Sequence, residues 1–215
     1  MNVVSSVLTT APATEPVTET EAKARLRLET AADDALITAL IVVARQKAEE
    51  YLRRALITQS WTLWLDTWPM TMQDRDWWDG VREGSIVSDL SPVITLPQSP
   101  AISITHIKTY AADNTATTMS SAGYRLDRAS SPARVLLNQG TTWPLPGRTR
   151  QGVEIEYVCG YGDASAVPRP IREGILMLVT HLYENREAIS EFGVSSAQLP
   201  FTIEAMWSPY RVIRL

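Results

Sequence analysis

A long segment without glycine or proline, from Asp33 to about Ala55, constrains the fold more than any other feature of the sequence. Its apolar residues recur with a period close to 3.6, which is typical of an amphipathic α-helix with one buried face. The stripe comprises Leu36, Ile37, Leu40, Val43, Ala44, Ala48, Tyr51 and Leu52, with Lys47 as its charged exception. The sequence therefore predicts a long helix over residues 33–55 that packs through this face.

Two further helices are predicted, one before this segment and one near the C-terminus. Thr18 and Glu21 have the spacing of a capping box, which predicts a short helix beginning there. Pro170 lies in the first turn of a second predicted helix, where a missing backbone N–H costs nothing. Its apolar stripe should pack on the long helix and consists of Ile171, Ile175, Leu178, Val179, Leu182 and Tyr183. We expect residues 18–56 and 168–190 to form a helical bundle.

Between these helices the periodicity changes to that of strands. Candidate strands, separated by turn signals, are the alternating stretch around Trp61–Leu65 and residues 93–96, 102–110, 123–127, 134–138 and 152–158. In the last of them Val153, Ile155 and Tyr157 alternate with glutamates, as in a half-buried antiparallel strand. The predicted fold class is α+β: a bundle of helices with a small antiparallel β domain inserted over residues 57–160.

Three segments lack periodicity. Residues 1–17 are predicted to be a flexible N-terminal arm. Residues 69–91 are predicted to be a long loop, a feature that is usually functional or disordered in compact domains. Residues 191–215 are too apolar for a solvated tail, so we expect this C-terminal segment to dock on its own chain or on a partner.

Composition excludes several classes of protein. The net charge of −4 argues against tight nucleic-acid binding by general basicity. The single cysteine, Cys159, excludes an internal disulfide and a zinc site built from cysteines. No apolar run approaches the roughly 20 residues that span a bilayer. The N-terminus lacks the charged region and apolar core of a signal peptide.

The sequence holds no credible catalytic, cofactor-binding or metal site. Gly160 and Gly162 follow a strand and precede a helix, but Ser165 stands where a dinucleotide fingerprint needs its third glycine. We interpret them as a corner between strand and helix. His106 and His181 are far apart in the sequence, and Cys159 is expected to be a buried small hydrophobe. The acidic residues Asp74, Asp76 and Asp79 do not complete a calcium loop.

Two segments are instead suited to contact with another protein. The first is the Trp-rich loop, with Trp68, Trp77 and Trp78 as candidate partner-contact residues. The second is the C-terminal segment, which is apolar and able to add a strand to a neighbour's sheet. The alternative is that both segments fold back and pack on the chain itself.

Four stretches, taken in order, carry a resemblance to a known family. They are VTETEAKARLRLE with DDALITALIVVARQKAEEYLRRALITQSWTL, then ITLPQSPAISITHIKTYAADN, then VEIEYVCGYGDASAVPRPIREGILMLVTHLYENREA, and finally EAMWSPYRV. Their order and spacing over residues 16–213 resemble the head–tail connector (adaptor) family of tailed bacteriophages and gene transfer agents. Residues 70–91 do not align with that family.

The resemblance implies a structural virion protein rather than an enzyme, without a cofactor. It implies a ring, typically a dodecamer, that binds the portal protein of the capsid and a downstream stopper or tail-completion protein. DNA would pass through the channel without specific binding, and no membrane is involved. The expected location is the head–tail junction of a virion or phage-like particle assembled in the bacterial cytoplasm. The C-terminal residues Trp207, Tyr210, Arg211, Val212 and Ile213 are the expected portal contacts.

Two alternatives remain open from the sequence. One is a stopper or tail-completion protein of a phage-like particle, which is expected to consist mostly of strands without a long N-terminal helix pair. The other is a small ligand-binding domain whose pocket combines the loop around residues 68–79 with the Gly160 corner.

Overall fold

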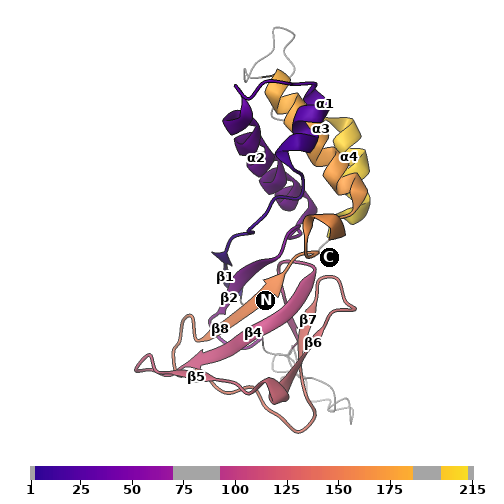
Figure 1. The fold of residues 1–215 in the computed structure, drawn as a ribbon. Coiled ribbons are helices and arrows are strands. Elements are labelled where there is room, and N and C mark those ends of the chain that lie inside the picture. Colours follow the sequence, from indigo (N-terminus) through magenta and orange to yellow (C-terminus); the bar gives the residue numbers. More distant parts are fainter. Residues whose placement is uncertain (1–2, 70–92, 186–199, 213–215) are drawn as a thin grey trace. The chain divides into compact units, whose positions relative to one another are not determined.

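The computed structural model describes residues 3–69, 93–185 and 200–212, and Figure 1 shows their fold. They form two compact units. The β unit comprises Met1–Ala11 and Ser60–Cys159, and the helical unit comprises Pro12–Gln59 and Gly160–Leu215. The chain therefore enters the β unit twice, so each unit is assembled from segments distant in sequence. Together they give a mixed α+β fold, as the sequence predicts.

The β unit holds two sheets. The larger has the strand order β1 (Val3–Thr10), β2 (Gln59–Leu65), β8 (Val153–Cys159), β4 (Ala101–Tyr110) and β5 (Ala116–Thr118). The smaller has the order β3 (Ile94–Thr95), β7 (Arg134–Leu137) and β6 (Tyr124–Asp127). The pairings β1–β2, β4–β8, β4–β5, β3–β7 and β6–β7 are antiparallel. Successive side chains of a strand point to opposite faces of its sheet, so a strand can bury one face only.

Strand β8 shows this alternation most clearly. Val153, Ile155, Tyr157 and Cys159 are buried, while the residues between them are only partly covered. The predicted burial of the apolar positions in residues 152–158 is therefore confirmed. Cys159 has no exposed surface, which agrees with its interpretation as a buried small hydrophobe.

The prediction of a flexible N-terminal arm over residues 1–17 is wrong for Val3–Thr10, which form strand β1. Val3–Thr10 pair with β2, and the hydroxyl oxygens of Thr9 and Thr62 lie 2.6 Å apart. The run VVSSVLTT is rich in β-branched residues, which favour strands. Its partner strand lies about fifty residues later in the chain, so local periodicity did not reveal the pairing. Val17, at the end of the predicted arm, is buried in the helical unit.

The helical unit contains α1 (Glu19–Leu26), α2 (Asp34–Leu52), α3 (Arg169–Glu184) and α4 (Phe201–Trp207). Helix α3 packs against α1, α2 and α4, and α1 also packs against α2. The predicted capping box is present, because Thr18 and Glu21 each bond the other's backbone N–H. No helix among the described residues is long and apolar enough to cross a membrane.

The buried face of α2 differs from the predicted stripe. The buried residues are Ile37, Ile41, Ala44, Arg45, Ala48 and Leu52. Leu36, Val43 and Lys47, which were expected on the stripe, are exposed instead. Most residues from 35 to 44 are apolar, so a wide apolar surface satisfies the helical period at more than one rotation. Only the positions of α1 and α3 decide which rotation is buried.

The Gly160 segment is the corner that the sequence predicts. Gly160 and Gly162 have φ values of 125° and 117°, which side chains with a Cβ rarely adopt. A Cβ at Gly160 would also lie 2.4 Å from the carbonyl oxygen of Ile57. The backbone N–H of Tyr161 donates to the Leu56 carbonyl, which ties the corner to the segment after α2. Glycine is required here for close backbone approach.

Candidate functional site

The C-terminal segment, where the sequence places the portal contacts, docks on the helical unit. Trp207 has no exposed surface, and its Nε1–H donates to the Ile171 carbonyl at 3.3 Å. Its indole lies against Gly174, where an added Cβ would stand 2.2 Å from Nε1. Trp207 also contacts the ring of Tyr51. This tryptophan is a core residue of the chain.

The residues after Trp207 are held by the end of α2. The N–H of Val212 donates to the Leu52 carbonyl at 3.0 Å, and Val212 is buried. The Nε–H of Arg54 donates to the carbonyl of Tyr210 at 2.6 Å. The guanidinium of Arg211 lies 5.1 Å from the centre of the Tyr51 ring. The segment is therefore fixed by backbone and ring contacts up to Val212.

This placement reduces the number of expected portal-contact residues that have accessible surface. Trp207 and Val212 are buried in their own chain, whereas Tyr210 is half-buried and Arg211 is exposed. Ile213 lies outside the described residues. The sequence left open whether this segment docks on its own chain or on a partner, because α4 is a single short helix and the glycine that receives its tryptophan lies in α3.

Trp68 also belongs to its own chain's interior. It is 7% exposed, its ring stacks on Trp143 at 4.3 Å, and its Nε1–H donates to the Pro144 carbonyl at 2.6 Å. Trp77, Trp78 and the rest of the predicted loop at 70–91 lie outside the described residues. Of the three candidate tryptophans, the one that the structure describes therefore serves the β unit itself.

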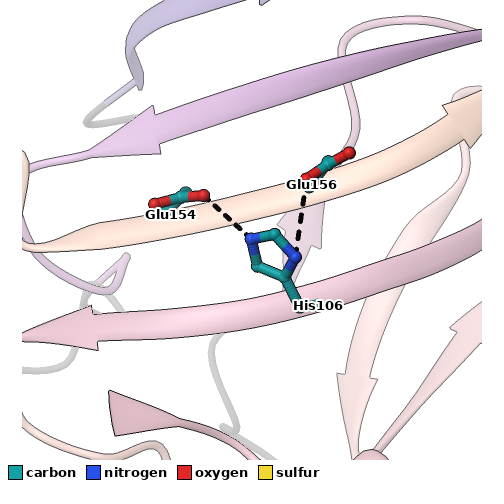
Figure 2. Close-up of side chains that lie close together, drawn as sticks. All are labelled: His106, Glu154 and Glu156. Carbon is teal, nitrogen blue, oxygen red and sulfur yellow. Dashed lines mark hydrogen bonds and ion pairs between the residues drawn. The ribbon is translucent and has the colours of Figure 1, made fainter. Parts of the chain in front are cut away.

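A polar cluster that the sequence analysis did not assemble lies on one face of the larger sheet (Figure 2). His106 on β4 stands between Glu154 and Glu156 of β8. Its Nε2 lies 2.8 Å from Glu154 and its Nδ1 lies 3.4 Å from Glu156. The antiparallel register sets His106 opposite Glu156 and Lys108 opposite Glu154. The alternating glutamates of β8 were the available signal, but the strand pairing was needed to join them to His106.

The rest of the cluster is organised around Glu154. The hydroxyl of Tyr110 donates to the second oxygen of this carboxylate, and the ammonium of Lys108 lies 3.9 Å from the first. Burial raises the pKa of Glu154, but the bonds from Tyr110 and His106 and the charge of Lys108 outweigh it, and the net pKa is lowered. The bond to Glu154, helped by burial, raises the pKa of Tyr110 to about 12.

Among the described residues, His106, Glu154 and Glu156 form the group whose donor atoms could hold a metal ion. One ligand atom from each lies within 4.8 Å of the others. However, the two ring nitrogens of His106 each face a different carboxylate, so one bond to a glutamate must break before both carboxylates reach a metal on one nitrogen. The arrangement is that of a cross-strand hydrogen-bonded cluster that joins β4 to β8.

Replacing Tyr110 with phenylalanine is expected to lower the free energy of unfolding by about 1 kcal/mol at neutral pH, since a bond to a charged carboxylate is lost at a partly solvated site. The folded pKa of Tyr110 is raised to about 12, so this stabilisation is complete below pH 10 and disappears as pH rises through 12. Thermal melts of both proteins at increasing pH measure the difference. Tyr124→Phe, outside the cluster, is the control; equal effects of the two substitutions would contradict this assignment.

Comparison with known proteins places these observations in context. Residues 20–132, more than half of the chain, match the family model described as phage gp6-like head-tail connector protein. Among curated protein sequences, none matches this chain.

Three solved structures share the fold over nearly the full length. One, from the neck of an empty GTA particle computed with C6 symmetry, has a TM-score of 0.75 at 23% identity and covers 99% of this chain and 97% of that one. A chain from the virion of a native gene transfer agent (GTA) particle has a TM-score of 0.71 at 24% identity, covering 98% and 96%. A chain from the neck of a native GTA particle computed with C12 symmetry has a TM-score of 0.62 at 23% identity, covering 97% of each.

Proposed function

Because this chain belongs to the family of phage gp6-like head-tail connector proteins, we propose that it is the adaptor subunit between the portal of a capsid and the next ring of the neck. The family match carries this proposal. The likeness in fold to chains of GTA necks supports it, since both units of this chain find a counterpart there. The role is structural, as expected for a component of a virion or phage-like particle.

The proposed assembly is a ring of twelve copies around a channel for DNA. Its support is the similarity to chains in neck structures that were computed with C6 and C12 symmetry. The downstream partner is a stopper or tail-completion protein. The net charge of −4 suits a channel through which DNA slides, because basic linings hold phosphate strongly. The long helix α2 favours an adaptor over a stopper, for which mostly strands are expected.

The portal-facing site in this proposal is the end of the docked C-terminal segment. Of the expected portal contacts that the structure describes, Tyr210 and Arg211 have accessible surface, and Ile213 follows them in the sequence. Trp207 and Val212 act indirectly, because their burial fixes where the segment leaves the helical unit. A charged and aromatic pair on a fixed support is suited to a protein contact, since Arg and Tyr are enriched in interfaces.

The test mixes the purified full chain with the portal ring of the same particle and weighs the products by native mass spectrometry. We expect about twelve copies per portal ring, by analogy with the C12 neck. Two variants test the site: Arg211→Glu, and a chain that ends at Val212. Both keep Trp207 in the core, whereas a deletion from Pro200 onward would remove it.

Both variants are expected to bind the portal more weakly than the full chain. The truncated chain should keep its melting temperature, and Arg211→Glu should lose no more than its cation–π contact with Tyr51, about 0.5–1 kcal/mol. Arg169→Glu is the matched control, because the Arg169 side chain is 88% exposed and lies outside the C-terminal segment. Failure of the unaltered chain to bind the portal would overturn the proposed function. Binding that is unaffected by both variants would move the contact site elsewhere.

A further inference from the structure

Helix α2 is apolar on two opposite faces along its first half. At 100° per residue, Leu36, Ala39 and Val43 lie on the side opposite to Ile37 and Ile41. The inner face is buried, whereas Leu36 is 37% exposed, Val43 is 48% exposed and Ala39 is also exposed. We call Leu36, Ala39 and Val43 the outer face of α2. A helix that is apolar all round is normally buried on every side.

The spacing of the outer face is that of a helix-packing seam. Leu36, Ala39 and Val43 follow one another at intervals of three and four residues, which keeps them in line along the helix. The small side chain of Ala39 lies between the two larger ones in this row. The rest of this surface carries charge only towards the end of the helix, where Lys47 pairs with Glu50. The surface is therefore apolar and accessible to an apolar side chain of a partner.

A second exposed apolar face lies on α4. Phe201 is 83% exposed and Ala205 is exposed one turn later, while Ile203 and Trp207 on the other side of α4 are buried. We call Phe201 and Ala205 the outer face of α4. A phenylalanine with so much exposed surface is a candidate anchor for contact with a partner.

The two outer faces lie on opposite sides of the helical unit. Both α2 and α4 pack against α3 through their buried faces. In Figure 1, α2 and α4 flank the pair α1 and α3. Each outer face therefore points away from α3, and one copy of the chain cannot bring its own two faces together. A second copy can offer the α4 face to the α2 face of the first.

We propose that neighbouring copies of this chain associate by packing Phe201 of one copy against Ala39 of the next, between Leu36 and Val43. This proposal rests on the proposed function and names the surface that forms the ring. A contact between two different faces repeats from copy to copy, and a repeat that closes gives a ring. Pairing of two identical α2 faces would stop at a two-fold dimer, which favours the α2–α4 pairing as the occupant.

Cysteine cross-linking tests the pairing directly. The single native cysteine, Cys159, is fully buried, so the unaltered chain provides a low background. Ala39→Cys and Ala205→Cys each place a small thiol on one exposed face. The two single variants are mixed at high protein concentration, with and without the portal ring, and treated with a short bismaleimide. We expect a covalent dimer from the mixture, and a ladder of higher products from the double variant.

Three outcomes decide the proposal. Mixed dimers and a ladder support it. Dimers from Ala39→Cys alone overturn it in favour of the two-fold pairing. Thr117 is an exposed position on β5 and serves as the control. If the mixture of Ala39→Cys and Ala205→Cys cross-links no more strongly than the mixture of Thr117→Cys and Ala205→Cys, the proposal is also overturned. Portal binding by the unaltered chain is read separately, so a portal-bound ring without these cross-links refutes the interface and leaves the proposed function standing. Cross-links without portal binding support the interface and refute the proposed function.

Two further variants guard against effects of the introduced thiols. Phe201→Ala removes the anchor and is expected to weaken self-association about tenfold, as measured by analytical ultracentrifugation. Val43→Lys, which puts a charge at the receiving face, is expected to act in the same direction. Unchanged self-association in both variants would contradict the proposal.

Discussion

Trp207→Ala is expected to lower the free energy of unfolding of the helical unit by about 3–5 kcal/mol, the usual cost of emptying a buried tryptophan site. The substitution removes a side chain with no exposed surface and the bond from its Nε1–H to the Ile171 carbonyl. The cavity cannot close easily, because Gly174 has no side chain to fill it. Urea unfolding followed by circular dichroism at 222 nm, which reports helix content, measures the change.

Phe201→Ala is the matched control for this prediction, because it truncates an aromatic residue on the same short helix. Phe201 is 83% exposed, so its removal is expected to change the free energy of unfolding of the monomer by less than about 0.5 kcal/mol. Similar losses in both variants would mean that α4 is not docked through Trp207. The pair also separates the two roles of α4, since Trp207 serves the fold and Phe201 the proposed association.

Arg45→Ala is expected to cost about 3–5 kcal/mol, because it leaves two carboxylates partly buried without their counter-charge. The Arg45 side chain is 8% exposed and bonds Glu15 at 2.8 Å and Glu49 at 2.7 Å. Glu49 in turn accepts from the Leu56 N–H and from the Gln59 side chain. The triad thus ties the N-terminal segment, α2 and the start of β2 together. Urea unfolding of the variant checks the value.

Lys47→Ala is the control, since Lys47 pairs with Glu50 on the solvated side of the same helix and should contribute less than about 1 kcal/mol. Acidity provides a second check. Burial raises the pKa of Glu15 even with Arg45 beside it, so in Arg45→Ala this carboxyl should protonate more readily still. The deficit should therefore shrink as pH falls through the Glu15 pKa. A deficit that does not change with pH would contradict the assignment.

Helices α1, α2 and α3 could be predicted from the sequence because their signals are local. The capping box at Thr18 and the glycine-free run after Asp33 involve residues within a few positions of one another. The alternation in residues 152–158 likewise fixes which side chains of β8 are buried. Strand β1 could not be predicted in this way, because its hydrogen bonds go to β2, far along the chain.

The candidate sites depended on the tertiary structure for the same reason. The sequence marked Trp207 and Val212 as contact residues because they are apolar and near the end of the chain, and apolarity does not distinguish a partner's surface from the chain's own core. His106 was judged isolated because its carboxylate partners lie on another strand. The sequence did not reveal the outer face of α2, because the predicted apolar stripe combined residues of the exposed face and of the buried face.

The sequence by itself determined helices α1, α2 and α3, the α+β class, the Gly160 corner and the family to which the order of motifs points. Each of these depends on backbone preferences or on spacing along the chain. Only the tertiary structure decided which rotation of α2 is buried, where the C-terminal segment docks and which charges meet across β4 and β8. These depend on the packing of segments that are distant in sequence. The energy of that packing is determined by excluded volume and burial, which a local sequence pattern does not record.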